Sequence, residues 1–261
     1  MSKIIAIANQ KGGVGKTTTS VNLSASLAAM KRRILIIDMD PQGNATTGVG
    51  LDKHQEEVSL DQVLLGEADI KDLMLDAPDS SIKMLPGGPS LTIAELNLMQ
   101  AEDREFRLKN ALRTIKDDFD FVIIDCPPSL NMLTVNALVA ADGVMIPMQC
   151  EYYALEGLSA LMGTIETIRE SANPDLEITG LLRTMYDPRN NLARDVGKQL
   201  SDHFGDKLYN TSIPRNIRLA EAPSHGQPVI TYDKNSRGAL AYLALAAEMI
   251  RKETGLMDEA G

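Results

Sequence analysis

The sequence predicts an α/β fold in which a single doubly wound, mostly parallel sheet is covered by helices on both faces. Unbroken apolar runs recur at residues 4–8, 34–37 and 121–124, and such runs are typical of parallel strands that are buried on both faces. Stretches with apolar residues at helical spacing alternate with them. A turn that contains three glycines joins the first run to the first helical stretch. Together these observations indicate one open sheet built from alternating strands and helices.

The composition favours a single cytosolic domain. A chain of 261 residues is long enough to bury a large core without disulfides, so we expect one domain over residues 1–261. A net charge of −10 gives no general attraction to nucleic acid or to an anionic membrane. The two cysteines, Cys126 and Cys150, suit a reducing cytoplasm. The sequence shows neither a signal peptide nor an apolar run of about 18 residues.

The first half of the chain alternates short strands and helices. The first helix is followed by three basic residues at 31–33, which suit a helix C-terminus. Proline and glycine predict an irregular loop at 38–44. The expected elements are strands at 3–9, 34–38 and 82–85 and helices at 18–30, 59–65, 70–75, 91–99 and 104–116.

The second half continues this alternation. Ser129 is expected to cap the helix that follows the next strand, because a serine hydroxyl accepts from free backbone N–H groups. The expected elements are strands at 119–125, 143–148, 178–185 and 207–209, a helix from Ser129 to about residue 141, a helix that ends near residue 171, and helices at 192–204 and 238–253.

Residues 10–18 carry the strongest functional signal, with the sequence Gln-Lys-Gly-Gly-Val-Gly-Lys-Thr-Thr between a strand and a helix. Glycines let successive backbone N–H groups point inward, and with the positive end of the helix they form a cradle for phosphate oxygens. Lys16 is expected to reach the β- and γ-phosphates, and the Thr17 hydroxyl to take one position on Mg²⁺. We therefore expect a nucleoside triphosphate site formed by Lys11, Gly12, Gly13, Val14, Gly15, Lys16, Thr17 and Thr18.

This loop departs from the common pattern G-x-x-x-x-G-K-[ST]. Gln10 replaces the usual glycine, and a second lysine, Lys11, follows it. A lysine at the mouth of the loop points away from the helix of its own loop, so it is available to a nucleotide that another subunit holds. We therefore expect Lys11 and Lys16 both to take part in catalysis.

Carboxylates follow two of the apolar strands. Because open α/β sheets bind ligands at the carboxyl ends of their strands, Asp38 and Asp40 are expected near the phosphates. Asp40 is expected to position an attacking water and to support the water shell of the metal. The structural alternative for either residue is a helix cap or a turn. Asp125 ends its strand in the manner of a Walker B motif and is expected near Mg²⁺, through water.

Glu151 follows the strand at 143–148 and belongs to the same edge of the predicted sheet. We expect it to face the nucleotide or a partner subunit, and a solvated carboxylate is the alternative. The chain has three histidines, His54, His203 and His225. They lack the spacing of metal ligands, so we expect them to have surface or packing roles.

Five segments together resemble the ParA/Soj family of chromosome-partitioning ATPases, whose phosphate loop is the deviant Walker A form of the P-loop. They read K-G-G-V-G-K-T-T, D-M-D-P-Q-G-N-A-T, I-I-D-C-P-P-S-L, Q-C-E-Y-Y-A-L-E-G and I-P-R-N-I-R-L-A-E-A-P-S-H-G. The resemblance covers essentially the whole chain and implies ATP and Mg²⁺, an ATP-bridged homodimer, and hydrolysis that needs Asp40. It also implies that Lys11 reaches across the dimer and that Pro214, Asn216 and Met185 border the adenine.

Basic residues gather between residues 180 and 240, where nine basic and six acidic side chains give a charge of +3, against −13 for the rest of the chain. From charge alone, a solvated face is an equally good interpretation. The resemblance implies non-specific binding of double-stranded DNA through Arg189 and Arg218, slow hydrolysis stimulated by a ParB-type partner, and a cytoplasmic, nucleoid-associated protein. Since the first strand starts at residue 3, we do not expect the N-terminal helix-turn-helix extension of larger relatives or operator-specific repression.

Three other functions share this loop. A MinD-like membrane-associated ATPase needs a basic amphipathic C-terminal helix, whereas the last predicted helix is alanine-rich and residues 257–260 are acidic; no membrane partner is expected. An electron carrier like the nitrogenase iron protein needs two cysteines for a shared iron–sulfur cluster, but Cys126 and Cys150 are better explained as small buried hydrophobes. A metabolic ligase or kinase needs a second substrate pocket, and none is readable in the sequence.

Overall fold

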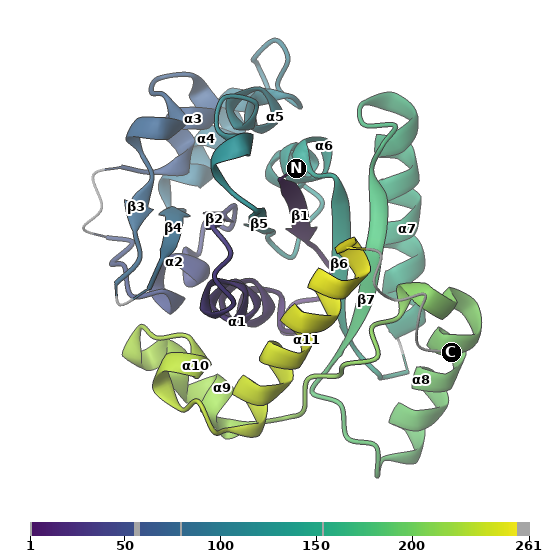
Figure 1. Ribbon diagram of the computed structural model, residues 1–261. Coiled ribbons are helices and arrows are strands. Elements are labelled where there is room, and N and C mark those ends of the chain that lie inside the picture. The colour runs from purple at the N-terminus through teal and green to yellow at the C-terminus, as the bar shows by residue number, and fades with distance from the viewer. Residues whose placement is uncertain (1, 55–57, 79, 153, 255–261) are drawn as a thin grey trace.

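The structure, a computed structural model, describes residues 2–54, 58–78, 80–152 and 154–254, so the acidic tail at 257–260 lies outside the described residues. Seven strands form one sheet in the order β3-β4-β2-β5-β1-β6-β7, which runs from left to right in Figure 1. Neighbouring strands are parallel except β3, which is antiparallel to β4. The predicted doubly wound, mostly parallel sheet is therefore confirmed.

The strands in the centre of the sheet are the apolar runs of the sequence. All residues of β2 and β5 are buried, and their register places Asp38 beside Asp125 at the carboxyl ends. The strands are β1 (Lys3–Ile7), β2 (Ile34–Asp38), β3 (Leu75–Asp76), β4 (Ile82–Leu85), β5 (Phe121–Asp125), β6 (Gly143–Gln149) and β7 (Glu177–Thr184).

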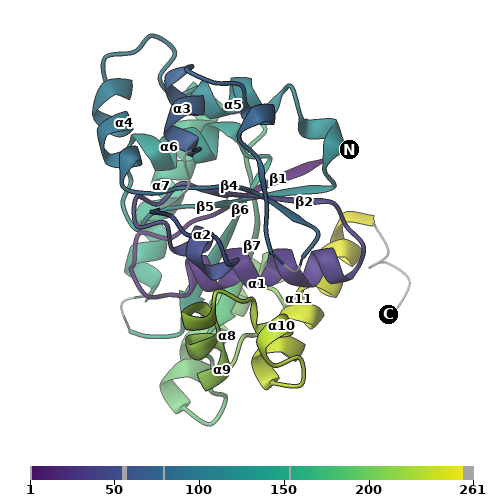
Figure 2. The same cartoon turned by 90° about the vertical axis from the view of Figure 1, so that its left-hand side faces the viewer.

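Helices cover both faces of the sheet, which Figure 2 shows edge-on. Alternate side chains of β1 enter two separate cores, Ile4 and Ala6 on one face and Ile5 and Ile7 on the other. The first core is covered by α3 (Leu60–Leu65), α4 (Ser90–Leu98), α5 (Arg107–Leu112), α6 (Met132–Ala140), α7 (Ala154–Ser171) and α8 (Asn191–Phe204). The second is covered by α1 (Lys16–Ala29), α2 (Asn44–Gly48), α9 (Ile217–Glu221), α10 (Val229–Tyr232) and α11 (Arg237–Thr254).

Two predicted elements have a different structure. The helix expected at 70–75 is a 3₁₀ turn, Ile70–Asp72, which the two residues of β3 soon follow. The strand expected at 207–209 is wrong, because Gly205 takes a positive φ of 48° and opens a 3₁₀ turn, Gly205–Lys207. Within the described part of this segment, only Leu208 forms a bridge to the sheet, with Leu181.

The cap of α6 also differs from the prediction. Asn131, not Ser129, is the capping residue, and its side-chain oxygen accepts from the backbone N–H of Thr134. The backbone carbonyl of Ser129 instead accepts from the Thr134 hydroxyl over 2.6 Å. The helix therefore begins at Met132, and the loop after β5 is longer than predicted.

Candidate functional site

The phosphate loop bends at two glycines. Gly13 and Gly15 have φ angles of 73° and 88°, a left-handed conformation that residues with a Cβ disfavour. Helix α1 begins directly afterwards at Lys16, and its first turn carries no acidic side chain. A Cβ atom added at Gly12 or Gly13 would meet nothing within 4 Å. The loop therefore presents backbone and open space in front of a helix N-terminus, as an anion site requires.

Lys16 lies inside this loop. It is 7% exposed, and its Nζ donates to the carbonyl oxygen of Lys11 over 3.2 Å. Burial lowers the pKa of Lys16, and the charges of Asp125 and Asp40 act in the opposite direction. Its ammonium thus lies between the loop carbonyls and the carboxylates that end the neighbouring strands.

Asp125 joins the phosphate-loop helix to the carboxyl end of β5. Its two carboxylate oxygens accept from the hydroxyl of Thr17 over 2.8 Å and from that of Ser20 over 2.7 Å. Asp125 is fully buried. The structure thus brings two of the three predicted metal-site residues, Thr17 and Asp125, into direct contact.

Asp38 and Asp40 shape the loop after β2. One carboxylate oxygen of Asp38 accepts from both the backbone N–H and the hydroxyl of Thr46, over 2.9 and 2.8 Å, and the other accepts from the N–H of Asp40 over 3.2 Å. Asp40 is 8% exposed and accepts from the N–H of Gln42 over 2.9 Å. Asp38 therefore has the structural role of holding this loop. Asp40 stabilises the turn through Gln42 and lies at the carboxyl edge of the sheet.

The three aspartates concentrate negative charge in a buried place. Burial, and then the charge of Asp38, raises the pKa of Asp125, and burial likewise raises the pKa of Asp38. A divalent cation at this edge would compensate the crowded carboxylates, so the residues fit Mg²⁺. The described residues contain no cluster of three or more His, Cys, Asp or Glu side chains arranged to hold a metal. Mg²⁺ commonly relies on few protein ligands, together with water and phosphate oxygens.

Lys11 and Glu151 form an ion pair at the mouth of the loop. The Lys11 Nζ lies 2.6 Å from a carboxylate oxygen of Glu151, and their side chains are 41% and 55% exposed. Glu151 therefore lies at the predicted edge. An ion pair this exposed contributes only about 0–1 kcal/mol, so Lys11 can exchange Glu151 for another partner at little cost.

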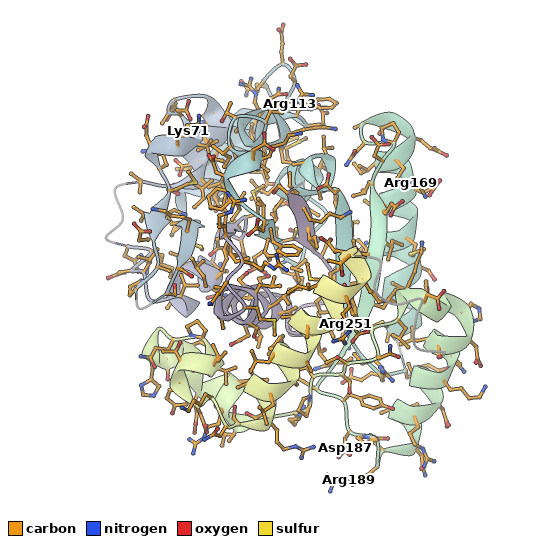
Figure 3. All side chains as sticks on the ribbon, in the orientation of Figure 1. Lys71, Arg113, Arg169, Asp187, Arg189 and Arg251 are labelled. Atoms are coloured by element: carbon orange, nitrogen blue, oxygen red, sulfur yellow. The ribbon has the colours of Figure 1, made fainter. Side chains whose placement is uncertain are left out.

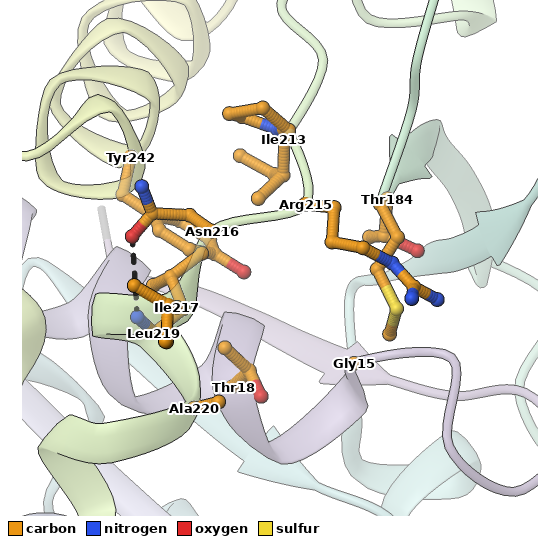
Figure 4. Close-up of a pocket in the computed structure, with 12 residues that line it drawn as sticks. Gly15, Thr18, Thr184, Ile213, Arg215, Asn216, Ile217, Leu219, Ala220 and Tyr242 are labelled. Carbon is orange, nitrogen blue, oxygen red and sulfur yellow. Dashed lines mark hydrogen bonds between the residues drawn. The ribbon is translucent and has the colours of Figure 1, made fainter.

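An apolar cavity of about 430 Å³ opens beside the loop, and Figure 4 shows its lining. Gly15 and Thr18 form one wall, and Met185, Pro214 and Asn216 belong to the lining. The three residues predicted to border a base are thus brought together. The side-chain oxygen of Asn216 accepts from two backbone N–H groups at the start of α9, and Met185 has a positive φ of 48°.

The two predicted DNA-contacting arginines lie outside this cavity, and both are ion-paired. Arg189, at the lower edge of Figure 3, pairs with Asp187 over 2.8 Å. The guanidinium of Arg189 lowers the pKa of Asp187 to about 2. Arg218 contacts Glu221 over 2.8 Å and Asp233 over 3.3 Å. Their local charge is therefore partly neutralised by the chain itself.

Two observations bear on the alternative functions. Cys126 and Cys150 are 1% and 7% exposed, and burial raises the pKa of both thiols, which disfavours the thiolates that an iron–sulfur cluster needs. In the ranges that the structure describes, none of the helices combines the length and the hydropathy needed to cross a bilayer.

Several residues that position the site were not predicted. The buried Thr184 hydroxyl donates to the carbonyl of Val14 in the phosphate loop over 2.7 Å, and the hydroxyls of Thr19 and Tyr242 lie 3.1 Å apart beside the cavity. Ser20 and Thr46 bind the two buried aspartates. Only Ser20 carried a signal, because it lies one helical turn after Lys16 and so faces the same side as the loop.

The chain is similar to known proteins over most of its length. The family model AAA_31, described as an AAA domain, matches residues 2–178. The chain is 52% identical to the sporulation initiation inhibitor protein Soj of Bacillus subtilis, over 95% of this chain and 98% of that one. It is 51% identical to the chromosome partitioning protein ParA of Caulobacter vibrioides, over 96% and 95%.

A solved structure supports the same fold. The cobyrinic acid a,c-diamide synthase of Mycobacterium smegmatis with bound ADP and magnesium superposes with a TM-score of 0.85 at 37% identity, covering 97% of this chain and 96% of that chain. The phosphate loop, the neighbouring aspartates Asp38 and Asp125 and the extent of the sequence matches lead to one conclusion. The chain belongs to the ParA/Soj family of chromosome-partitioning ATPases.

Proposed function

We propose that this chain is an ATP-dependent dimerising switch for chromosome partition. In this proposal it binds DNA non-specifically as an ATP-bridged homodimer and leaves the DNA after hydrolysis, which a ParB-type partner stimulates. The observation that carries the proposal is the meeting of Lys16, Thr17, Asp40 and Asp125 at one edge of the sheet, in front of an open glycine loop.

ATP binding follows from the loop and the neighbouring cavity. The loop N–H groups and Lys16 would hold the β- and γ-phosphates, while the cavity between Gly15 and Asn216 has the size and apolar character for a base. Thr17 would hold Mg²⁺ directly and Asp125 through water. Mg²⁺ would neutralise charge that develops on the phosphates. The cobyrinic acid synthase, which bears ADP and magnesium on the same fold, supports this assignment.

Hydrolysis requires a water held in line with the terminal phosphate. We assign Asp40 to this water for two reasons. The carboxylate of Asp40 lies close enough to Lys16 to affect the pKa of Lys16. The backbone N–H of Asp40 is held by the carboxylate of Asp38. We also propose that turnover by the isolated protein is slow, as the resemblance to the ParA/Soj family implies.

Dimerisation depends on Lys11. We propose that Lys11 leaves Glu151 and binds the phosphates held by a second subunit, which would place charge from two chains on one nucleotide. Glu151 would then face the nucleotide or the partner subunit. Cleavage of the bridging phosphate would weaken this contact and release the subunits.

DNA binding is assigned to the basic residues between positions 180 and 240, which include Arg189 and Arg218 and which we propose to form one basic face. Their ion pairs are exposed, so phosphate oxygens can compete with Asp187 and Glu221 for the guanidinium groups. Such contacts give no sequence preference and weaken steeply with salt. Two copies of the face in a dimer raise the avidity without new contacts, which links DNA binding to ATP and places the protein on the nucleoid.

The test is retention on DNA with ATP, with ADP and without nucleotide, for the wild type, Lys16→Ala and Asp40→Ala. We expect ATP-dependent retention of the wild type, loss of retention for Lys16→Ala, and retention without release for Asp40→Ala. Retention of the wild type that is equal in ATP and ADP would contradict the proposal.

A further inference from the structure

Two adjacent glycines lie in the loop that follows β4. Residues 86–89 of this loop read Pro-Gly-Gly-Pro, and residues 86–88 are buried. Strands β2 and β4 are parallel neighbours, with Ile37 opposite Leu85, and they lie side by side in Figure 1. The loops that follow these two strands therefore meet at the carboxyl edge of the sheet, where Asp40 also lies.

Gly87 approaches the end of β2 so closely that no larger residue fits. A Cβ atom at Gly87 would lie 2.2 Å from the backbone carbonyl oxygen of Asp38, far inside van der Waals contact. A Cβ atom at Gly88 would meet only the carbonyl oxygen of Lys53, at the ordinary contact distance of 3.5 Å. Neither glycine has a positive φ angle. The close approach to Asp38, and not the backbone conformation, therefore requires glycine at position 87.

The hydroxyl of Thr46 strengthens this contact. It donates to a carboxylate oxygen of Asp38 over 2.8 Å and accepts from the backbone N–H of Gly87 over 3.1 Å. Thr46 is completely buried. The other carboxylate oxygen of Asp38 accepts from the backbone N–H of Asp40 over 3.2 Å. One buried hydroxyl therefore links the loop after β4 to the carboxylate that holds the backbone of Asp40.

The loop that carries Asp40 contacts Gly87 at a second point. A Cβ atom at Gly43 would lie 2.9 Å from the backbone carbonyl oxygen of Gly87, so the two backbones are nearly in contact there as well. Asp38 and Gly43 are thus both held against the same residue. Asp40 lies between them in the chain, so the position of its carboxylate depends on Gly87.

We propose that Gly87 and Thr46 are positioning residues for ATP hydrolysis, because they hold the segment from Asp38 to Gly43 where the carboxylate of Asp40 reaches the attacking water. In this proposal neither residue contacts the nucleotide, and both act through Asp40. The role of Asp40 rests on the proposed function, whereas the contact between the two loops does not. A misplacement of about 1 Å can lower a rate by about 100-fold, so a small shift of this segment is enough to slow hydrolysis.

The test compares Gly87→Ala with Gly88→Ala, which add the same methyl group at adjacent positions of one loop. Turnover at saturating Mg²⁺ and ATP gives kcat, and titration with a fluorescent ATP analogue gives the nucleotide affinity. We expect kcat of Gly87→Ala to fall at least about tenfold, because the methyl group displaces the carbonyl of Asp38. The affinity for the analogue should stay within about twofold of the wild type.

Gly88→Ala should match the wild type in both measurements, because its methyl group meets only an ordinary contact. Equal kcat values for the two glycine variants would overturn the proposal. A loss of nucleotide affinity in Gly87→Ala as large as its loss of kcat would also overturn it, since Gly87 would then support the whole site and not the position of Asp40.

Thr46→Val and Thr46→Ser test the same contact without added bulk, and circular dichroism verifies the folding of all variants. Valine keeps the shape of threonine but lacks the hydroxyl, whereas serine retains it. We expect kcat to fall in the valine variant and to stay within about threefold of the wild type in the serine variant. Equal kcat values for these two variants would contradict the role of the hydroxyl.

Hydrogen exchange gives a readout that does not depend on hydrolysis. The backbone N–H groups of Asp40 and Thr46 both donate to Asp38. Without nucleotide, they should exchange at least about tenfold faster in Gly87→Ala than in the wild type or Gly88→Ala. Unchanged exchange in Gly87→Ala would refute the positioning contact. Absence of any ATPase activity in the wild type would contradict the proposed function, and the exchange rates would then decide whether Gly87 holds this loop.

Discussion

The ammonium of Lys11 lies 2.6 Å from the carboxylate of Glu151, although 140 positions of the chain separate the two residues. The contact joins the phosphate loop to the loop after β6 at the edge where β1 and β6 run side by side. Lys11 is therefore paired at the surface with a residue of its own chain. The proposed switch requires this lysine to change partners.

A change of partner is feasible only if the ion pair contributes little to folding. We expect Glu151→Gln to alter the free energy of unfolding by less than about 1 kcal/mol, because both side chains are largely exposed. The matched contrast is Glu248→Gln. Glu248 is 2% exposed and accepts from the N–H groups of Asn210 and Thr211, so its loss should cost about 1–3 kcal/mol. Urea unfolding measures both, and equal losses would contradict this view of the pair.

The second prediction concerns the basic face. Arg218→Glu places a third carboxylate beside Glu221 and Asp233, so we expect at least about a tenfold loss in affinity for DNA and unchanged affinity for ATP. The slope of log affinity against log salt should fall by about 1 for each lost phosphate contact.

Arg113→Glu is the charge-matched control for this variant, since Arg113 lies at the opposite end of the view in Figure 3 from Arg189. DNA binding by the Arg113 variant should equal that of the wild type. If both variants lost DNA binding equally, total charge rather than this face would be responsible.

The third prediction follows from the buried aspartates. The folded-state pKa of Asp125 is raised by burial and by Asp38, so the native state retains a proton that the unfolded state releases. Stability from this group is therefore full below its unfolded pKa, near 4, and is lost as pH rises toward the folded pKa, near 8. Without nucleotide or Mg²⁺, the Tm of Asp125→Asn should exceed that of the wild type by a margin that grows from pH 5 to pH 8.

A constant difference in Tm across this range would show that Asp125 keeps an ordinary pKa. Mg²⁺ with a nucleotide should reduce the margin at pH 8, because a cation stabilises the ionised carboxylate of the wild type and finds no charge in the asparagine variant.

The sequence predicted the parts of the fold that have a strong local signal. The apolar runs of β1, β2 and β5 are continuous, and the loop glycines are needed for left-handed bends, so these elements lie where they were expected. Helices α2, α9 and α10, with five, five and four residues, are shorter than the window in which helical spacing is visible. The wrong strand at 207–209 has apolar residues, but Gly205 turns the chain before them.

The site was predictable in its residue types and less so in its contacts. Asp125 and Thr17 were expected at the same ion, and the structure adds the hydrogen bond between them. The contact of Thr184 with Val14 joins the end of β7 to the phosphate loop, and that of Lys11 with Glu151 joins the loops that follow β1 and β6. A single sequence carries no periodicity that reports such pairs.

The central claim is that one triphosphate, bound by Lys16 of one subunit and Lys11 of the other, holds the dimer together. Sedimentation velocity with Mg²⁺ and a non-hydrolysable ATP analogue tests it most directly, on the wild type and on Lys11→Ala, with Lys71→Ala as the control for loss of a surface lysine. We expect dimers for the wild type and the control and monomers for Lys11→Ala with nucleotide still bound. A monomeric wild type, or a Lys11→Ala protein that dimerises as well as the wild type, would contradict the claim.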